Sequence, residues 1–418
     1  MKKINNSRYI ASKILADWIE KEFFPEKELS KLQKDRAFVM EVVYGCIRQY
    51  AILKWLLNKW VKKTPSNYSQ AVVYVGFYQI MFMNNIEEFA AINETVEAAK
   101  NQPNGNVIAK FVNALLRRCQ RDLRDIKAEL NQQEISLQLS HPPELFDKWT
   151  DRYGPEKAFK LAEWNNCIPR TFLRVNQRKI TMVSYKKKLS DACINFDDYD
   201  EKFIIIPRGI SIISLPGYDE GLFTVQDPAT ANAVDLLNPK EKEKILDACA
   251  SPGGKSMIIA EYMNGGKGLT AMEIHQDRIP RLKENFKRCD LSEIMIIQGD
   301  ARTPEKYVSD VYDGILCDAP CSNTGVLQRR VDARWRVDQN RIKKLNKLQT
   351  QILDGCARLL KSNGRLVYST CSLEKEENED LVASWLKSNS DFYLEKELNI
   401  FPLDLKTDGA YVALIRRC

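Results

Sequence analysis

Histidine is almost absent from this sequence of 418 residues, which contains only His141 and His275. This scarcity makes a histidine-rich metal centre or a Ser-His-Asp triad difficult to build. The eleven cysteines include no C-x-x-C pair, which argues against a zinc ribbon, so no bound metal is expected. Any catalytic chemistry must therefore come mainly from carboxylates, thiols, lysines and backbone groups.

Targeting and membrane-spanning segments are also missing. The N-terminal sequence MKKINNSRYIASK lacks the apolar stretch of a signal peptide. The longest apolar run, Ala71 to Met83, is too short and too interrupted to span a bilayer. Together with the odd number of cysteines, these features predict a cytoplasmic protein with reduced thiols and no membrane partner. We also expect a monomer.

The positive charge is unevenly distributed. The net charge is +7, and residues 1–140 alone contain 21 basic and 15 acidic side chains. A second basic cluster, residues 329–347, surrounds Trp335. Arginine guanidinium groups bind phosphates, and an aromatic ring beside them can stack on a base. A solvated helix face is the alternative interpretation, and for a charge run alone it is the more frequent one.

Three regions follow one another along the chain. Residues 1–138 have apolar residues at helical spacing, which predicts an all-α domain. Residues 139–222 combine a long helical stretch from Pro143 with short β-rich pieces such as FIIIP and ISIISL, which predicts a small α+β module. Residues 223–418 alternate strand-like runs with turns and helices, which predicts a Rossmann-like α/β domain with a mostly parallel sheet. The strand-like runs are KILDACA, GLTAMEI, IMIIQGD, YDGILCDAP and GRLVYST.

The first of these runs leads into a glycine-rich turn, KILDACASPGGKS, at residues 244–256. The P-loop pattern fails because Cys249 stands at the position of its first glycine, and G-x-G-x-x-G is absent. A nucleoside ligand without phosphates, such as S-adenosylmethionine, fits better. Glu273 ends the second strand, where it can accept from ribose hydroxyls, and Asp300 follows the third, where it can accept from an adenine amino group.

Two cysteines follow neighbouring strands of the same sheet. Cys321 comes just after the fourth strand, which ends near Asp318, and Cys371 comes just after the fifth. A helix expected from Ser372 would give Cys371 thiolate character. Methylating carbon 5 of cytosine needs a thiolate that adds to carbon 6, an acid at ring N3 and a group that assists release. Cys371, Cys321 and Asp318 supply these residue types.

The motifs CASPGGK, DAPCSNTG and STCS resemble those of the RNA cytosine-C5 methyltransferases of the NOL1/NOP2/Sun family. The resemblance implies that Cys371 is the nucleophile, that Cys321 assists release and that S-adenosylmethionine is the cofactor. It also assigns a set of residues to the cofactor and target-base pocket. These are Cys249, Ala250, Ser251, Pro252, Gly253, Gly254, Lys255, Glu273, Asp300 and Asp318.

The rest of the chain carries a related resemblance. The segment KDRAFVMEVVYGCIR is similar to the NusB-type helical RNA-binding domain, which precedes the catalytic part in the bacterial 16S rRNA methyltransferase B branch. RTFLRVN is similar to that branch's small RNA-binding module. The resemblance implies methylation of a 16S rRNA cytosine, in free or early-assembly small-subunit RNA. One departure is RRVDARW, residues 329–335, where many relatives carry His-Pro before the acid. The arginines expected to contact RNA are Arg329, Arg330, Arg334 and Arg336.

Three alternatives remain open at this point. The same chemistry could act on tRNA or 23S rRNA. A catalytically silent, NusB-like RNA-binding assembly factor is disfavoured, because neither cysteine and none of the cofactor carboxylates is lost. A P-loop-like NTPase is disfavoured by Cys249.

Overall fold

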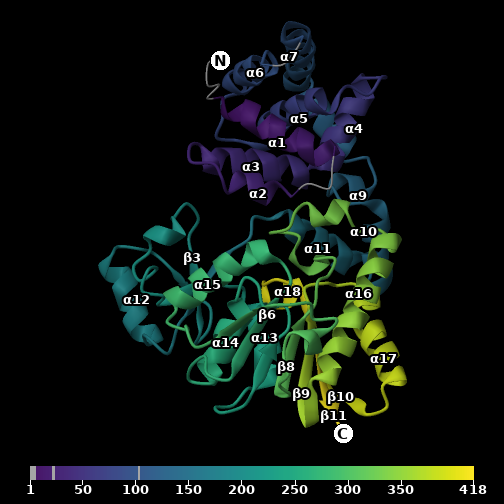
Figure 1. Cartoon of the computed structure of the whole chain (residues 1–418). Helices are drawn as coiled ribbons and strands as arrows, with labels where there is room; N and C mark the ends of the chain where they lie inside the picture. Colours follow the sequence, from purple (N-terminus) through teal and green to yellow (C-terminus); the bar gives the residue numbers. More distant parts are fainter. Residues whose placement is uncertain (1–5, 21–23, 102–103) are drawn as a thin grey trace. The chain divides into compact units, whose positions relative to one another are not determined.

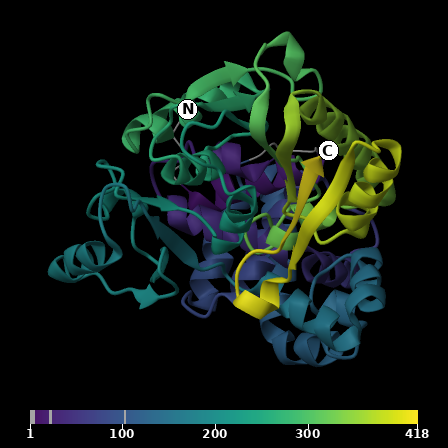
Figure 2. The same ribbon diagram turned by 90° about the horizontal axis from the view of Figure 1, so that it is seen from below.

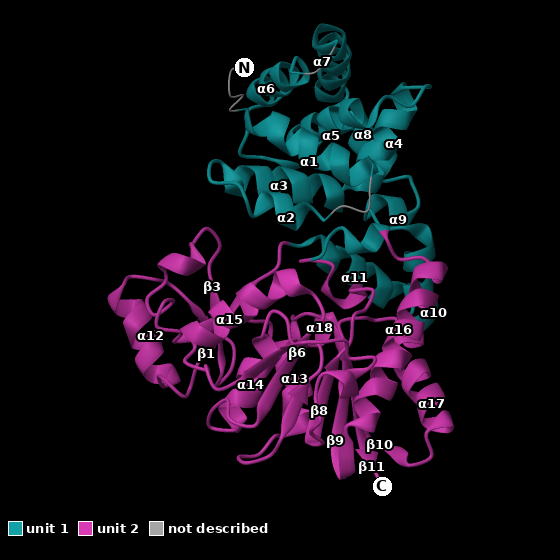
Figure 3. Ribbon diagram, viewed as in Figure 1, with its two compact units in different colours: residues 1–167, 330–335 teal, residues 168–329, 336–418 magenta. Residues whose placement is uncertain are grey.

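The computed structural model describes residues 6–20, 24–101 and 104–418 (Figure 1). The expectation about a signal peptide concerns in part Met1–Asn5, which lie outside the described residues. The chain forms two compact units (Figure 3). Unit 1 comprises Met1–Cys167 with Arg330–Trp335, and unit 2 comprises Ile168–Arg329 with Arg336–Cys418. The three-domain division at residues 138 and 222 stays a sequence-based prediction. Within the described ranges, no helix is long and apolar enough to cross a membrane.

Unit 1 is helical, as the periodicity predicted. Its helices are α1 (Ser7–Glu20), α2 (Pro25–Leu29), α3 (Arg36–Arg48), α4 (Tyr50–Trp60), α5 (Asn67–Phe82), α6 (Glu88–Ala99), α7 (Gly105–Arg121), α8 (Leu123–Leu130), α9 (Ile135–Gln138), α10 (Pro143–Tyr153) and α11 (Pro155–Asn166). The single helical stretch expected from Pro143 is two helices, because Gly154 has a φ of +81° and Pro155 starts a new helix.

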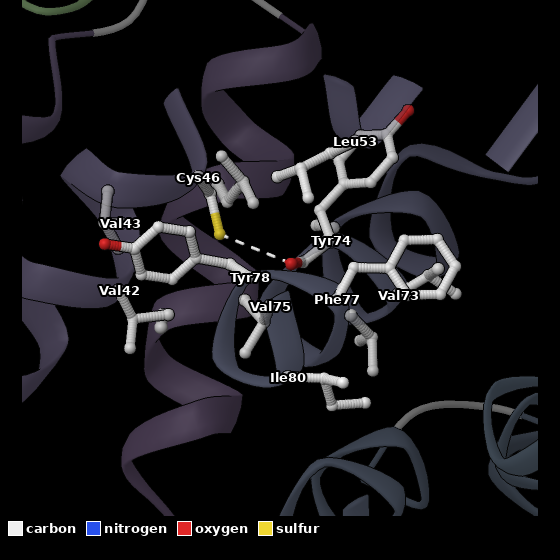
Figure 4. Close-up of a cluster of buried hydrophobic side chains, with 14 of the residues drawn as sticks. Val42, Val43, Cys46, Leu53, Val73, Tyr74, Val75, Phe77, Tyr78 and Ile80 are labelled. Atoms are coloured by element: carbon white, nitrogen blue, oxygen red, sulfur yellow. Dashed lines mark hydrogen bonds between the residues drawn. The ribbon is translucent and has the colours of Figure 1, made fainter. Parts of the chain in front are cut away.

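The core of unit 1 forms around α5, which is buried on nearly all sides. Ser66 caps this helix by accepting from the backbone N–H of Ser69 at 3.3 Å. Figure 4 shows valine, tyrosine and phenylalanine side chains of α5 packed against α3 and α4, with the Cys46 thiol donating to the carbonyl of Tyr74 at 3.5 Å. The apolar run from Ala71 is therefore a core helix. Burial raises the pKa of the Cys46 thiol, which makes it an unreactive core residue.

Unit 2 begins with a small antiparallel sheet in the order β2-β3-β1-β4, packed against one helix. Its elements are β1 (Thr171–Val175), α12 (Met182–Asp191), β2 (Asp197–Asp198), β3 (Phe203–Ile206) and β4 (Phe223–Val225). The β-rich expectation for ISIISL is wrong. This segment forms a 3-10 turn, η1 (Ile212–Ser214), because Ser214 bonds back to the Ser211 carbonyl through both its N–H and its hydroxyl.

A seven-stranded sheet forms the centre of unit 2, in the order β10-β11-β9-β8-β5-β6-β7. The pairings β9–β8, β8–β5, β5–β6 and β6–β7 are parallel, and β11 is antiparallel to both of its neighbours. The strands are β5 (Ile245–Asp247), β6 (Leu269–Glu273), β7 (Met295–Gln298), β8 (Tyr312–Asp318), β9 (Leu360–Thr370), β10 (Phe392–Ile400) and β11 (Ala410–Arg417). The five strands predicted from the sequence are confirmed.

Helices cover both faces of this sheet (Figures 1 and 2). One face packs on α13 (Ala231–Leu237), α14 (Gly254–Tyr262) and α15 (Ile279–Arg288), and the other on α16 (Gln339–Arg358) and α17 (Glu379–Ser388). Ile315 and Leu316 of β8 point to opposite faces and are both fully buried, which is why the parallel strands read as continuous apolar runs. The short helix α18 (Pro402–Leu405) precedes β11. The doubly covered, mostly parallel sheet predicted from the sequence is thus confirmed.

Candidate active site

The residues predicted to form the site lie at the carboxyl ends of five adjacent parallel strands. Glu273 ends β6 and Asp318 ends β8, while Asp300 follows β7. Cys321 follows β8 and Cys371 directly follows β9. The loop between β5 and α14 contains Cys249, Ala250, Ser251, Pro252 and Gly253. Because parallel strands end at the same edge of a sheet, the fold brings these segments to one edge, where open α/β sheets bind their ligands.

The two thiols are in direct contact. Cys321 Sγ lies 3.1 Å from Cys371 Sγ, although the residues are fifty positions apart in sequence. The Cys371 thiol donates to Asn323 Oδ1 at 3.2 Å, and Asn323 Nδ2 donates to the Cys321 carbonyl at 2.9 Å. Gly325 N–H donates to the Cys371 carbonyl at 2.9 Å. These contacts hold the loop after β8 against the loop after β9.

The thiols differ in burial. Cys321 is buried, and its hydrogen bond to Cys371 together with its burial raises the pKa of its thiol well above the usual value. Cys371 is the more exposed of the two. Cys321 is therefore held as a neutral S–H group that can donate to its neighbour. This arrangement leaves Cys371 as the thiol that is more accessible from outside the protein.

Lys255 of α14 pairs with Asp318 at the end of β8, within electrostatic reach of Cys371. Lys255 Nζ donates to Asp318 Oδ2 at 2.5 Å, and Ser369 Oγ donates to Asp318 Oδ1 at 3.2 Å. Burial alone would lower the pKa of Lys255, but the attraction of Asp318 outweighs it and the pKa is raised. Ser256 is also engaged, since its hydroxyl donates to Asp247 at 2.6 Å. The Lys-Ser pair that resembled the end of a P-loop thus binds carboxylates of its own chain.

The glycine-rich turn and Glu273 fit a nucleoside-type cofactor. Gly253 has a φ of +102°, and a Cβ there would lie 2.9 Å from Leu282 and Phe286, so only glycine lets α15 pack against the turn. Glu273 is buried and accepts from the His275 N–H at 2.7 Å through Oε1. Among the described residues no hydrogen bond reaches its second oxygen, which leaves an acceptor for a ribose hydroxyl.

Asp300 is less free than the sequence suggested. The guanidinium of Arg302 donates to both carboxylate oxygens, with the Nη2–Oδ2 distance at 2.6 Å. These hydrogen bonds lower the pKa of Asp300, so it is ionised at neutral pH. A carboxylate has about four lone-pair sites, so Asp300 keeps acceptor capacity beside Arg302.

Glu377 is an important residue that the sequence analysis missed. It is fully buried, and its Oε1 accepts from the Ser322 N–H at 2.9 Å and from Gln349 Nε2 at 3.0 Å. Its Oε2 accepts from the hydroxyls of Ser322 and Ser372. Ser322 directly follows one site cysteine and Ser372 the other. One carboxylate therefore ties both cysteine loops together.

The predicted helix start at Ser372 is wrong, and α17 begins at Glu379. Ser372 Oγ accepts from the Glu374 N–H at 3.0 Å, so the capping signal is real, but it leads only to a 3-10 turn, η7 (Lys375–Glu377). Cys371 is consequently not at a helix N-terminus. Its environment is set by Asn323 and Cys321 instead.

The arginines expected to contact RNA have four different environments. The expectation for Arg334 is contradicted, because this side chain is fully buried and donates to the carbonyls of Ser140 and Asn165. Arg329 forms ion pairs with Asp227 at 3.1 Å and with Asp408 at 2.9 Å. The other two side chains keep exposed surface. Arg330 is exposed and pairs with Glu26, and Arg336 is partly exposed.

The strand order, the glycine-rich turn after β5, and the carboxylates and thiols along the same edge are together typical of α/β methyltransferases. Three family models match the chain. Residues 5–121 match the NusB family, residues 141–212 a ferredoxin-like domain of RsmF/B-like methyltransferases, and residues 234–415 the 16S rRNA methyltransferase RsmB/F family. The chain belongs to the family of ribosomal RNA small subunit methyltransferase B, as its full-length relatives show.

Two of these relatives are of nearly the same length as this chain. Ribosomal RNA small subunit methyltransferase B of Proteus mirabilis (strain HI4320) is 34% identical and covers 100% of both chains. The protein of that name from Erwinia tasmaniensis is 32% identical over 99% of each chain. Among solved structures, that of PH0851 has a TM-score of 0.79 and 23% identity, covering 98% of this chain and 99% of its own. The solved structure supports the fold alone.

Proposed function

We propose that this protein transfers a methyl group from S-adenosylmethionine to carbon 5 of a cytosine in 16S rRNA, acting in the cytoplasm on free or early-assembly RNA. The observation that carries the proposal is the contact between Cys321 and Cys371 beside the Lys255–Asp318 pair. Two thiols and an acid on adjacent strand ends are the groups that cytosine C5 methylation needs. The names of the full-length relatives support the choice of RNA.

The turn from Cys249 to Lys255 would hold the cofactor, and Glu273 and Asp300 would accept hydrogen bonds from its ribose and its adenine. When bound, S-adenosylmethionine supplies the methyl group on a positively charged sulfur. The Gly253 and Gly254 backbone lets the ligand approach closely, and the second oxygen of Glu273 offers the ribose an acceptor.

The target cytosine must leave its stack to reach the strand ends. Cys371 loses its proton to solvent and its Sγ forms a bond to carbon 6, while a proton passes from the Lys255 ammonium through the Asp318 carboxylate to ring N3. This addition makes carbon 5 nucleophilic enough to take the methyl group. After transfer the carbon 5 proton leaves to a base, the carbon 6–sulfur bond breaks, and the Cys321 S–H returns a proton to the departing Cys371 thiolate.

The test is methyl transfer from labelled S-adenosylmethionine to 16S rRNA that lacks 5-methylcytosine, with tRNA and 23S rRNA as competitors. We expect labelled 5-methylcytosine in 16S rRNA. If no RNA is methylated, the proposal that the protein is an RNA methyltransferase is refuted. If only tRNA or 23S rRNA is methylated, the proposal that 16S rRNA is the substrate is refuted.

The roles of the thiols are tested by two matched variants. Cys371→Ala should abolish both transfer and any covalent protein–RNA adduct. Cys321→Ala should accumulate the adduct, because the departing thiolate loses its proton donor. An adduct that forms in Cys371→Ala and is lost in Cys321→Ala would reverse the assignment.

A further inference from the structure

Unit 1 has an open pocket whose lining includes no residue used in the chemistry above. It has a volume of about 730 Å³, and its lining includes Tyr50, Lys54, Trp55 and Lys59 of α4. Trp335, from the 3-10 turn η6 (Ala333–Trp335), completes it. All of these residues belong to unit 1. Three aromatic side chains and two lysines thus line one depression.

Two of the three rings are held in place by protein contacts. Trp335 Nε1 donates to the Ile47 carbonyl at 2.7 Å, and its ring meets the ring of Tyr50 edge-on, with centroids 5.4 Å apart. Tyr50 in turn packs edge-on against Trp18 and Tyr74 of the core. Because the Trp335 ring is already fixed, stacking a ligand on it costs the protein little side-chain entropy.

The lysines give the pocket a positive rim. Lys54 is exposed, with its Nζ 5.9 Å from the centroid of the Tyr50 ring. Lys59 lies 5.8 Å from the Trp55 ring and is also paired with Glu129. Among the described residues, no carboxylate lies within ion-pair distance of Lys54. Its charge is therefore available to an anionic ligand.

We propose that this pocket binds a nucleotide of single-stranded RNA, with a base stacked on Trp55 and Trp335 and the adjoining phosphate at Lys54. Aromatic faces beside cations are the groups with which proteins hold single strands without reading their sequence. An anionic partner is favoured over an apolar peptide by Lys54 and by the basic excess of residues 1–140. The proposal rests on the proposed function only in taking RNA as the substrate.

The first experiment measures binding of a fluorescein-labelled, unstructured oligoribonucleotide of A and U by anisotropy, with the full chain. Trp55→Ala should raise the Kd about tenfold, and Trp55→Phe should restore most of the affinity, since stacking needs only a ring. Lys54→Ala should raise the Kd about threefold and reduce the salt dependence by about one ion. The controls are Phe89→Ala, which removes a ring that is 61% exposed and pairs with Arg117 elsewhere on unit 1, and Lys110→Ala on α7.

If Trp55→Ala binds the oligoribonucleotide with wild-type affinity, or if both control variants lose as much affinity as Trp55→Ala and Lys54→Ala, the proposal that this pocket binds RNA is refuted. Binding of a proline-rich peptide with no binding of the oligoribonucleotide would also overturn it, in favour of a protein partner. In the methylation assay, Trp55→Ala should raise KM for RNA while kcat stays unchanged. Failure of the wild-type enzyme to methylate any RNA would refute the proposed function. The anisotropy measurement would still show whether the pocket binds RNA.

Discussion

The buried carboxylate of Glu377 offers the sharpest test of how the thiols are positioned. In Glu377→Ala the hydroxyls of Ser322 and Ser372, 3.0 Å apart, can pair with each other, but the Ser322 N–H and Gln349 Nε2 lose an acceptor. Each buried unpaired donor costs about 1–3 kcal/mol, so we expect the free energy of unfolding to fall by about 4 kcal/mol. If the loops then shift by about 1 Å, kcat should fall about 100-fold.

Glu377→Gln separates hydrogen bonding from charge. The glutamine oxygen can accept from the two N–H donors, and both serine hydroxyls can rotate to accept from its NH₂ group. Burial raises the pKa of Glu377, so its charge is already disfavoured, and the neutral amide should keep kcat within about fivefold.

The measurements are urea unfolding and single-turnover methyl transfer, with Asp380→Asn, an exposed acid-to-amide change on α17, as the control. A Glu377→Ala enzyme that unfolds more easily but keeps wild-type kcat would show that Glu377 supports the fold without positioning the cysteines. A loss in Glu377→Gln as large as in Glu377→Ala would show that the charge itself is needed.

Three further changes have definite expected outcomes. Arg334→Ala should lower the free energy of unfolding by about 3 kcal/mol in a urea titration, because several buried carbonyl-type acceptors lose their donor, while RNA affinity of the folded variant should not change. Burial raises the pKa of Asp247 from 3.8 to about 6, so the folded protein binds this proton more tightly than the unfolded chain. Stability should therefore fall by about 3 kcal/mol as the pH rises from about 4 to about 6, and Asp247→Asn should remove this slope in unfolding curves measured across that range. Lys255→Met should reduce single-turnover transfer at saturating S-adenosylmethionine about 100-fold, because Asp318 loses the ammonium group that holds it; wild-type transfer under these conditions would contradict a role for the pair.

The strands and their site residues could be predicted from the sequence because the relevant signals are local. Short aliphatic runs such as the one ending at Asp318 are buried on both faces, and each gives way to polar or small residues where the strand ends. The parallel topology then places successive strand ends along one edge. The pairing of Cys321 with Cys371 came from family motifs, and the 3.1 Å contact between their sulfur atoms agrees with it.

Other features depended on tertiary neighbours that the sequence does not identify. Arg334 stands in a basic run, but its guanidinium turns inward to carbonyl groups supplied by residues far earlier in the chain. Glu377 stands in the acid-rich stretch EKEENE, where no local signal separates the buried acid from its exposed neighbours. A run of charged residues in the sequence does not show which of its side chains are buried. Only the folded structure shows which of them support the fold and which face solvent.

The direction of the thiol chemistry follows from the loops rather than from the cysteines themselves. Asn323 has a φ of +63° and, in that conformation, turns its side-chain oxygen to Cys371 while its amide donates to the Cys321 carbonyl. Cys371 is thereby left at the surface of the site, with Cys321 buried behind it and kept protonated. A buried S–H beside an accessible thiol can return a proton to a departing thiolate but cannot reach the base first. This difference in burial is our ground for proposing that Cys371 attacks the base and that Cys321 assists release, and the variants Cys371→Ala and Cys321→Ala test that order.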